Sequence, residues 1–204
     1  MDQNAHSKPP IIAMNRLDNL VDGVFAIAMT ILVLAVSVPT LKSANQEKEL
    51  LEFLASNFHD FYNYAVSFLI LGALWVSHAA QLRHLERTRP RHLWLNLTVL
   101  MLVCLVPFTT SLCGDYPHLL TARMLFHGNL LAVGIAMFVQ WRVGLADTSL
   151  FKANDSQGGG RDEVLENLLL PIASLAGALA AIWIPAWSNL VYFVIPLVKN
   201  RLRK

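Results

Sequence analysis

The stretch RLDNLVDGVFAIAMTILVL, from Arg16 to Leu34, decides the fold class of this chain. From about residue 20 to residue 38 the side chains are almost all apolar, and about 20 such residues cross a hydrocarbon core of roughly 30 Å. Asp22 lies inside this run, where a carboxylate is costly and is usually paired or functional. We therefore interpret residues 20–38 as a membrane helix that carries an informative aspartate.

Composition places the whole chain, and not only this stretch, in a membrane. Of its 204 residues, 55% are hydrophobic and only 15% are charged, which is more apolar surface than a soluble domain of this size can bury. The formal net charge of +2 is small and dispersed, so we expect no nucleic-acid partner. We predict a single transmembrane domain over residues 1–204, surrounded by membrane lipid and without a soluble domain.

Long, continuous apolar runs recur along the chain, each bounded by charged or turn-forming residues. The strands of a β-barrel would instead alternate apolar and polar residues, and these runs do not. The predicted fold class is therefore all-α, a polytopic bundle of six transmembrane helices. We place the spans at about residues 20–38, 61–82, 93–113, 122–141, 164–184 and 186–199.

Two short basic clusters set the predicted orientation. One follows the second span and the other follows the sixth, and both should be cytoplasmic by the positive-inside rule. Six crossings put both termini on one side, so the two assignments agree, and we expect the N- and C-termini in the cytoplasm. The N-terminus lacks the pattern of a secretory signal, so the first span should remain in the mature protein. The clusters contain Arg83, Arg87, Arg89 and Arg91, and Lys199, Arg201, Arg203 and Lys204.

A helical wheel divides the first span into two faces. At about 100° per residue, Ile27, Ile31 and Leu34 lie within about 60° of one another and form a stripe of branched apolar side chains. Asp22 lies about 140° from Ile27, nearly on the opposite face. If the stripe faced a pore, the carboxylate would face the neighbouring helices. The residues alone also allow, and by themselves favour, an ordinary stripe that packs against lipid or other helices.

Asp22 has candidate partners at its own depth in the predicted topology. His78 lies near the cytoplasmic end of span two, Trp75 one turn earlier on the same face, and Asn96 near the cytoplasmic start of span three. Arg16 is about 120° around the helix from Asp22, so the two are not a standard same-face ion pair. An interfacial, hydrated Asp22 and an interfacial His78 are the alternatives that the residues leave open.

No catalytic motif accompanies these residues. The chain lacks a phosphate-binding P-loop, an H-E-x-x-H motif, a C-x-x-C pair and a G-x-S-x-G elbow, so we expect no enzyme activity. Its histidines are scattered over several depths, so we expect no cofactor and no metal beyond permeating ions. Cys104 and Cys113 are predicted to be buried and unbridged. A T-V-G-Y-G filter is also absent, so any ion selectivity must come from side chains.

The stretch quoted above resembles the first helix of the transmembrane protein 175 family, the lysosomal potassium channels and their shorter bacterial relatives. The family signature there is R-x-x-x-F-S-D. This chain keeps the arginine as Arg16 and the aspartate as Asp22, and it has Leu20 and Val21 in place of phenylalanine and serine. The replacement of serine removes one hydroxyl, so Asp22 is expected to depend more on an indole or an imidazole.

The resemblance continues into the second and third spans. It includes W-x-x-H, at Trp75 and His78, and WLNL followed by PF, at Asn96, Pro107 and Phe108. It covers about the first 120 residues well, and the remainder of the chain only in hydropathy.

The resemblance implies a potassium-permeable cation channel, a homotetramer in which the first helix of each subunit lines a central pore without a carbonyl filter. Family pore positions match Ile27, Ile31 and Leu34, which would form a hydrophobic constriction, and Thr30 stands near it. The permeating ions would be K⁺ and other monovalent cations, and the location would be the plasma membrane of a prokaryotic cell. The polar network that supports this helix matches Arg16, Asp22, Trp75, His78 and Asn96.

Two functions from other classes stay open at this point. In a proton-coupled secondary transporter, Asp22 and His78 would titrate as a relay. Transporters often show internal repeats, and no convincing duplication is visible in this sequence. A membrane scaffold without transport activity is the third interpretation, and it predicts silent bilayers under all ions.

Overall fold

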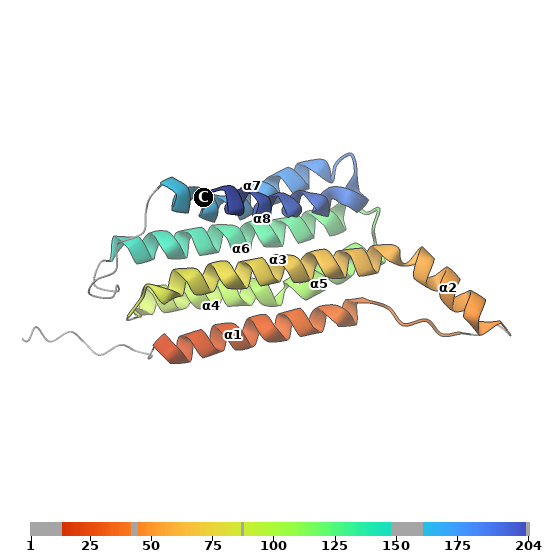
Figure 1. Ribbon diagram of the computed structural model, residues 1–204, viewed down its shortest axis with the longest axis horizontal. Coiled ribbons are helices and arrows are strands. Elements are labelled where there is room, and N and C mark those ends of the chain that lie inside the picture. Colours follow the sequence, from red (N-terminus) through yellow and green to blue (C-terminus); the bar gives the residue numbers. More distant parts are fainter. Residues whose placement is uncertain (1–13, 42–44, 87, 148–160, 203–204) are drawn as a thin grey trace, which may run out of the picture.

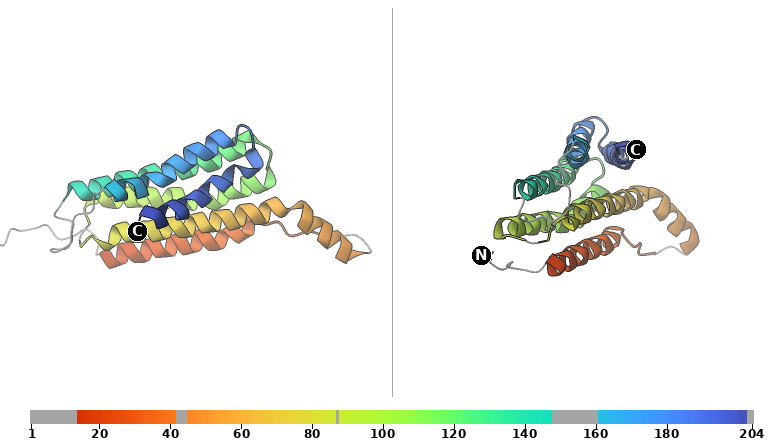
Figure 2. Two further views of the ribbon diagram at one scale, coloured as in Figure 1. Left: turned by 45° about the horizontal axis from the view of Figure 1, so that its top comes forward. Right: turned by 60° about the vertical axis from the view of Figure 1, so that its left-hand side comes forward.

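The structure is a bundle of long helices. The computed structural model describes residues 14–41, 45–86, 88–147 and 161–202. Figure 1 shows α1 along one edge of the bundle and α7 and α8 along the opposite edge. The first helix begins and the last helix ends at the same end of the bundle (Figures 1 and 2). In chain order the elements are α1 Met14–Ile31, the 3₁₀ helix η1 Leu32–Ala35, α2 Gln46–Ser56, α3 Phe58–Arg83, α4 Pro90–Cys104, α5 Val106–Asp115, α6 Leu120–Ala146, α7 Arg161–Ala180, the 3₁₀ helix η3 Pro185–Phe193 and α8 Val194–Leu202.

Among the described residues, five helical segments are long and apolar enough to cross a membrane. Each contains most of one predicted span, so the prediction of an all-helical, multi-span membrane protein is confirmed. Every segment begins before the residue that hydropathy predicted, because the polar first turn of a membrane helix is helical although it is not apolar. The segments cover residues 14–35, 58–83, 90–115, 120–146 and 163–180.

The sixth predicted span, residues 186–199, is not one continuous α-helix. Its first part is η3 and its second part is α8. Pro196 has no N–H to donate to the carbonyl of Tyr192, and its ring clashes with that carbonyl in α geometry. The α-helix therefore begins only at Val194, and the residues before it take the tighter 3₁₀ form.

The third span is also interrupted, between α4 and α5. Pro107 lacks the N–H that would bond the residue four positions earlier, and the backbone tightens so that the Leu105 N–H bonds the Leu102 carbonyl at 3.2 Å. Asn129 of α6 donates a side-chain hydrogen bond to that same carbonyl, also at 3.2 Å. The interruption is therefore stabilised by a polar contact from a neighbouring helix.

The packing of α6 against α7 requires a glycine. A Cβ atom added to Gly134 of α6 would lie 2.7 Å from Cδ of Pro171 in α7. No side chain fits at that separation, so glycine permits the two backbones to approach closely. Pro171 lies inside α7, and its ring fills the space that Gly134 leaves.

The short helix α2 was not among the predicted spans. Asn45 caps its first turn, because its Oδ1 accepts a hydrogen bond from the Lys48 N–H at 3.2 Å. α2 has no buried residue. In Figures 1 and 2 it extends beyond the end of the bundle, between α1 and α3 in the chain.

Candidate functional site

α1 packs one face against the bundle and leaves the other uncovered. Its inner face contacts α3, α4 and α5. On the opposite side Ile27 is 59% exposed, Ile31 is 44% exposed and Leu34 is 78% exposed. The predicted stripe therefore lies together on the uncovered face. The buried side chains of the inner face are Leu17, Val21, Phe25 and Ala28, with Leu32 of η1.

Asp22 lies at the border between these two faces. Its Oδ1 accepts a hydrogen bond from the indole Nε1 of Trp75 on α3, at 2.8 Å. Asp22 is nevertheless exposed, and Trp75 is 39% exposed. The carboxylate thus reaches the neighbouring helix yet remains accessible from the uncovered side of α1.

His78 and Asn96 are enclosed on the inner side of α1. Both side chains are 0% exposed. The imidazole of His78 lies with its ring centre 6.0 Å from that of Phe25 on α1. Gln140 of α6 lies beside this imidazole, and within the described residues neither His78 nor Asn96 makes a side-chain hydrogen bond of standard geometry. The structure therefore joins Asp22 to Trp75 and places the other two residues behind that pair.

The remaining two predicted residues lie on the surface of α1. Arg16 is exposed in the first turn of the helix, and the hydrogen bond that Asp22 accepts comes from Trp75. Thr30 is exposed between Ile27 and Ile31, and its hydroxyl donates to the Ile27 carbonyl at 2.8 Å. The hydroxyl proton of Thr30 is thereby committed to the backbone, and its oxygen lone pairs remain available at the surface.

A second polar cluster, which sequence reasoning missed, lies at the opposite end of the bundle. Arg123 of α6 is 0% exposed. Its Nη1 donates to Asn63 Oδ1 on α3 at 3.1 Å, and its Nη2 donates to the Cys113 carbonyl of α5 at 3.3 Å. Asn189 of η3 donates to the same Asn63 oxygen at 3.0 Å. Because the last turn of a helix attracts positive charge, the guanidinium stabilises the end of α5 while it connects α6 to α3, and Asn63 extends this connection to η3.

A signal for this cluster was present in the sequence. Arg123 is the second residue of the predicted span 122–141, and a charged side chain within a span is costly and seldom lacks a role. Its partners Asn63 and Asn189 carry no comparable signal, because amides near the ends of apolar runs are common in membrane helices.

His127 lies one turn after Arg123 and connects α6 to η3. Its Nδ1 lies 2.8 Å from the Tyr192 hydroxyl, and its Nε2 lies 2.9 Å from the Ser188 hydroxyl. A Cβ atom added to Gly177 of α7 would lie 2.5 Å from the ring, so α7 also packs closely on it. Both ring nitrogens of His127 are thus occupied by hydroxyl groups of η3, so the side chain fastens α6 to that segment.

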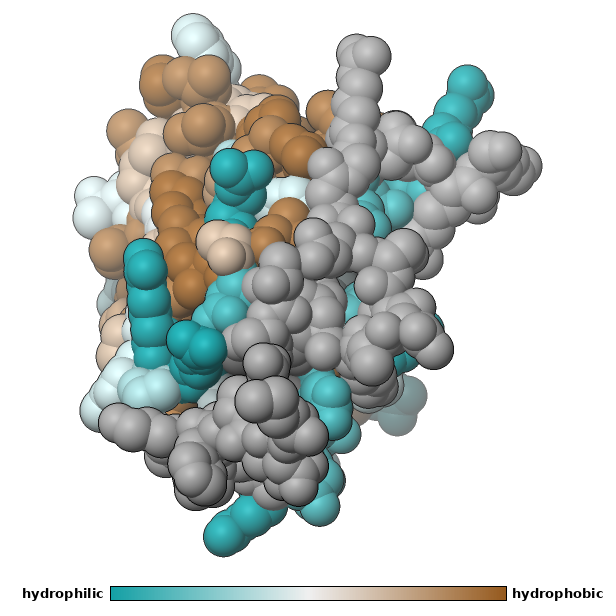
Figure 3. Space-filling view, turned by 90° about the vertical axis from the view of Figure 1, so that its left-hand side faces the viewer, coloured by the Kyte–Doolittle hydropathy of each residue, from teal (hydrophilic) through white to brown (hydrophobic). Residues whose placement is uncertain are grey.

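The end of the bundle where α3 ends and α4 begins carries many charged side chains. Figure 3 views this end and shows hydrophilic side chains next to exposed apolar ones. Arg89 Nε lies 3.0 Å from Asp147 Oδ2, an ion pair that connects the start of α4 to the end of α6. Arg87, Arg203 and Lys204, which belong to the predicted basic clusters, lie outside the described residues.

Neither cysteine is in a disulfide. Cys113 is buried, as predicted. Cys104 was also predicted to be buried, but it is exposed on the single chain. Exposure of this thiol costs little free energy because the group is small and weakly polar. In the part of the chain that the structure describes, no group of three or more His, Cys, Asp or Glu side chains could hold a metal ion.

The sequence of the candidate site matches a known family. Residues 16–107 match the family model described as endosomal/lysosomal potassium channel TMEM175. The matched segment contains α1, the hydrogen-bonded pair Asp22 and Trp75, and the enclosed residues His78 and Asn96.

Individual proteins are similar over part of their length. The chain is 37% identical to a potassium channel of Streptomyces collinus over 101 residues, which are 50% of this chain and 48% of that protein. It is 33% identical to a potassium channel of Chamaesiphon minutus over 130 residues, 62% of this chain and 64% of that protein. With the endosomal/lysosomal proton channel TMEM175 of Danio rerio it shares 25% identity over 114 residues, 56% of this chain and 22% of that protein. The chain thus spans less than two thirds of the length of each of these relatives.

The fold is similar over nearly the whole chain. The crystal structure of a lysosomal potassium-selective channel TMEM175 homolog from Chamaesiphon minutus has a TM-score of 0.77 and 27% sequence identity to it. The similarity covers 94% of this chain and 98% of that one, so it extends beyond residue 107 into the C-terminal helices.

Proposed function

This chain belongs to the transmembrane protein 175 family, a family of ion channels and not of enzymes, and on that premise we propose that it forms a potassium-permeable cation channel. The similarity to potassium channels of Streptomyces collinus and Chamaesiphon minutus supports the proposal. Four subunits surround a central pore, and α1 of each subunit lines it. Ile27, Ile31 and Leu34 form the constriction in place of a carbonyl filter.

The observation that carries the proposal is that α1 exposes a carboxylate, Asp22, as well as the apolar stripe. Asp22 lies about 12 Å along α1 from Met14, inside a segment that is apolar enough to cross a membrane. A carboxylate that faces lipid at such a depth costs roughly 2.5 kcal/mol or more. The uncovered side of α1 therefore has to meet water or protein. A ring of subunits around a water-filled pore supplies both.

The constriction selects ions through the cost of dehydration. Four copies of Ile27, Ile31 and Leu34 form stacked apolar rings, and such rings can close a pore by dewetting. An ion that sheds its water more cheaply passes more readily, so K⁺ is favoured over Na⁺ to a modest degree. The oxygen of Thr30 lies next to the constriction and offers a polar contact to a partly dehydrated ion.

A polar network holds the pore-lining helix in position. Trp75 binds Asp22 at 2.8 Å, and His78 packs against Phe25 on the inner face of α1. Asn96, buried on α4, adds an amide to the inner side of the network, and Arg16 adds a positive charge in the first turn of α1. In this arrangement the network sets the position of the constriction and does not itself contact the ion.

The six predicted crossings complete the proposed topology. In this proposal η3 and α8 form the sixth crossing, both termini lie on the cytoplasmic side, and residues 1–204 are one transmembrane domain. α1 begins and α8 ends at the same end of the bundle, which agrees with an even number of crossings (Figures 1 and 2). The bacterial relatives support a plasma-membrane location in a bacterial cell.

A planar-bilayer recording of the purified protein tests the channel and the constriction together. Under bi-ionic K⁺ and Na⁺, Ile27→Asn should raise the conductance or lower the preference for K⁺. The matched control is Ile172→Asn on α7, where the native side chain is 56% exposed against 59% for Ile27. Unchanged currents with Ile27→Asn would show that Ile27 does not line the pore. Bilayers that stay silent under all ions would overturn the proposal that the protein is a channel.

The alternative, proton-coupled transport through Asp22 and His78, has less support. Asp22 bonds the indole of Trp75, whereas His78 packs on the inner side against Phe25. A flux that saturates with substrate and follows a pH gradient would favour the transporter over the channel.

A further inference from the structure

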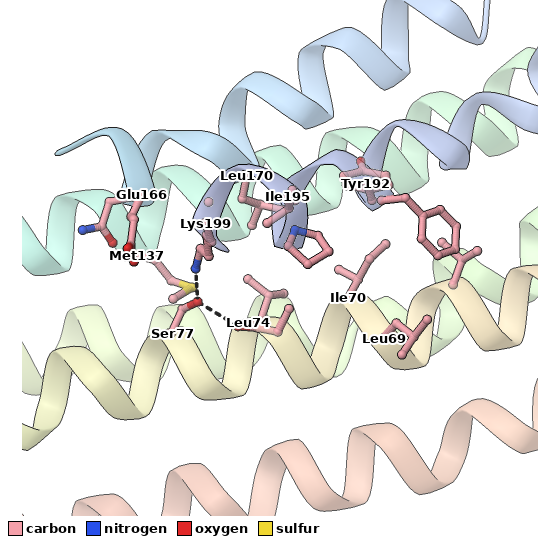
Figure 4. Close-up of a pocket in the computed structure, with 16 residues that line it drawn as sticks. Leu69, Ile70, Leu74, Ser77, Met137, Glu166, Leu170, Tyr192, Ile195 and Lys199 are labelled. Atoms are coloured by element: carbon pink, nitrogen blue, oxygen red, sulfur yellow. Dashed lines mark hydrogen bonds between the residues drawn. The ribbon is translucent and has the colours of Figure 1, made fainter. Parts of the chain in front are cut away.

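An apolar cavity lies between α3 and the segment formed by η3 and α8, away from α1. Its volume is about 200 Å³, far above the roughly 30 Å³ that one water molecule occupies in the liquid. Figure 4 shows side chains from α3, α6, α7, η3 and α8 converging on it. The apolar wall is formed by Val66, Ile70, Leu74, Met137, Leu170 and Ile195.

The cavity has a buried floor and an open side. Ile70 is 6% exposed and Leu74 is 5% exposed, whereas Leu69 is 58% exposed and Phe193 is 43% exposed at the rim. The opening therefore faces sideways, out of the flank of the bundle. In a chain that spans a membrane, this flank adjoins either hydrocarbon or another subunit.

The polar side chains of the cavity gather at one end. Lys199 of α8 lies with its Nζ 2.5 Å from the Ser77 hydroxyl of α3. Glu166 and Asn167 of α7 line the same end (Figure 4 shows Glu166 beside Lys199). Arg201, exposed, follows Lys199 on α8, so two basic side chains stand against the carboxylate of Glu166. This end of the cavity therefore carries a positive excess.

The length of the cavity matches one leaflet of a bilayer. From Val66 to Ser77 the wall follows α3 for about 16 Å, and half of a hydrocarbon core of roughly 30 Å is about 15 Å. Ser77 lies six residues, about 9 Å, before Arg83, the end of α3, so the polar end of the cavity is on the headgroup side, and the long side chain of Lys199 can reach toward the headgroups. An acyl chain lying along α3 would thus have its headgroup at Lys199.

We propose that this cavity binds one acyl chain of an anionic phospholipid, with the phosphate against Lys199. The apolar wall disfavours water as the occupant. The ammonium of Lys199 supplies donors that suit phosphate oxygens. The carboxylate of Glu166 at the same end would repel a headgroup with several negative charges. We therefore expect a headgroup with a single negative charge. This site is separate from the pore and its occupancy is measured without recording currents.

Photo-crosslinking of the full chain tests the site. The protein is reconstituted in phosphatidylcholine vesicles that contain a trace of phosphatidylglycerol bearing a diazirine in its acyl chain, and adducts are mapped by mass spectrometry. We expect adducts on residues 66–77 of α3 and 195–199 of α8, and loss of labelling when unlabelled phosphatidylglycerol is added in excess. A phosphatidylcholine probe should label about fivefold less, since it lacks the net charge that attracts a basic residue.

Two variants separate the acyl chain from the headgroup. Ala73→Phe fills the cavity and should reduce labelling by both probes, whereas Ala176→Phe, at an exposed position of α7 outside the cavity, should not. Lys199→Gln should remove only the preference for phosphatidylglycerol.

Three results would overturn the proposal. The first is labelling that unlabelled phosphatidylglycerol does not reduce; this test needs no variant and decides the question even if Ala73→Phe does not fold. The second is equal labelling in Ala73→Phe and Ala176→Phe. The third is a crosslink between two subunits formed by a photoreactive amino acid placed at Ala73, which would show that a second copy of the chain fills the cavity.

Discussion

The indole N–H of Trp75 donates to the carboxylate of Asp22 at 2.8 Å, and this bond connects the edge helix α1 to α3. The other contacts of α1 with the bundle are largely apolar, through Val21, Phe25 and Ala28. A hydrogen bond to a charged group contributes about 1.5 to 3 kcal/mol. The pair therefore adds a directional contact that fixes how α1 is rotated, which apolar packing alone leaves less defined.

Trp75→Phe should lower the stability of the protein. The change removes the donor to Asp22 and leaves the carboxylate without it, so we expect a loss of about 1.5 to 3 kcal/mol. The measurement is thermal unfolding of the purified protein in detergent. Trp94→Phe on α4 is the control, because Trp94 is 70% exposed and its loss should change stability little. Equal effects of the two variants would show that the bond to Asp22 contributes nothing.

Gly134→Ala should loosen the contact of α6 with α7. The new methyl group would lie 2.7 Å from Cδ of Pro171, so the backbones have to separate, and overpacking of this kind costs about 1 to 3 kcal/mol. Gly128→Ala on the same helix meets no atom within 4 Å and should be neutral or slightly stabilising. Thermal unfolding of both variants makes the comparison, and a destabilised Gly128→Ala with an unaffected Gly134→Ala would contradict it.

Arg123→Met should be among the most destabilising single changes in the chain. It removes the donors to Asn63 Oδ1 and to the Cys113 carbonyl inside the bundle, and each buried acceptor that loses its donor costs about 1 to 3 kcal/mol. Arg142→Met on the same helix is the control, since Arg142 is exposed. Yield of folded protein and thermal unfolding are the readouts. Near-identical stability of the two variants would mean that the buried cluster is dispensable.

Thr30→Val tests whether an oxygen near the constriction contacts the ion. The hydroxyl proton of Thr30 is donated to the Ile27 carbonyl, so its oxygen is free to accept the partial contact of a cation. Valine removes that oxygen at nearly constant shape, and we expect the single-channel K⁺ conductance to fall about fivefold, the factor for a contact of about 1 kcal/mol. Thr30→Ser retains the oxygen and should conduct like the original protein. A Thr30→Val channel with unchanged conductance would place the ion path away from this side chain.

Sequence reasoning reached the multi-span helical fold because the relevant signals are local. Hydropathy over about 20 residues marks a membrane helix whatever its neighbours are. The same reasoning singled out Asp22, since a carboxylate within a span is costly unless it finds a partner, and Trp75, since its indole N–H is a donor on the same face as His78. Their actual pairing at 2.8 Å required the structure, because the sequence offered His78, Asn96 and Arg16 as candidates as well.

The C-terminal part shows where local signals were insufficient. Residues 186–199 read as one apolar span, but Pro196 divides them into η3 and α8. Arg123 carries a local signal, since it is a charge within a span, but nothing near it in the sequence identifies the end of α5 as its partner. The predicted spans also omitted α2, whose cap at Asn45 is a local signal that hydropathy does not measure.

The sequence by itself determined that the chain is a helical membrane protein, approximately where its helices run, and which polar residues within them need partners. Only the tertiary structure decided the rotation of α1 that leaves Ile27, Ile31 and Leu34 uncovered, and the choice of Trp75 as the partner of Asp22. The physical reason is that helix formation depends on contacts within a few residues, whereas the choice of neighbouring helix depends on fits such as Gly134 against Pro171. Neither residue of such a pair signals the other.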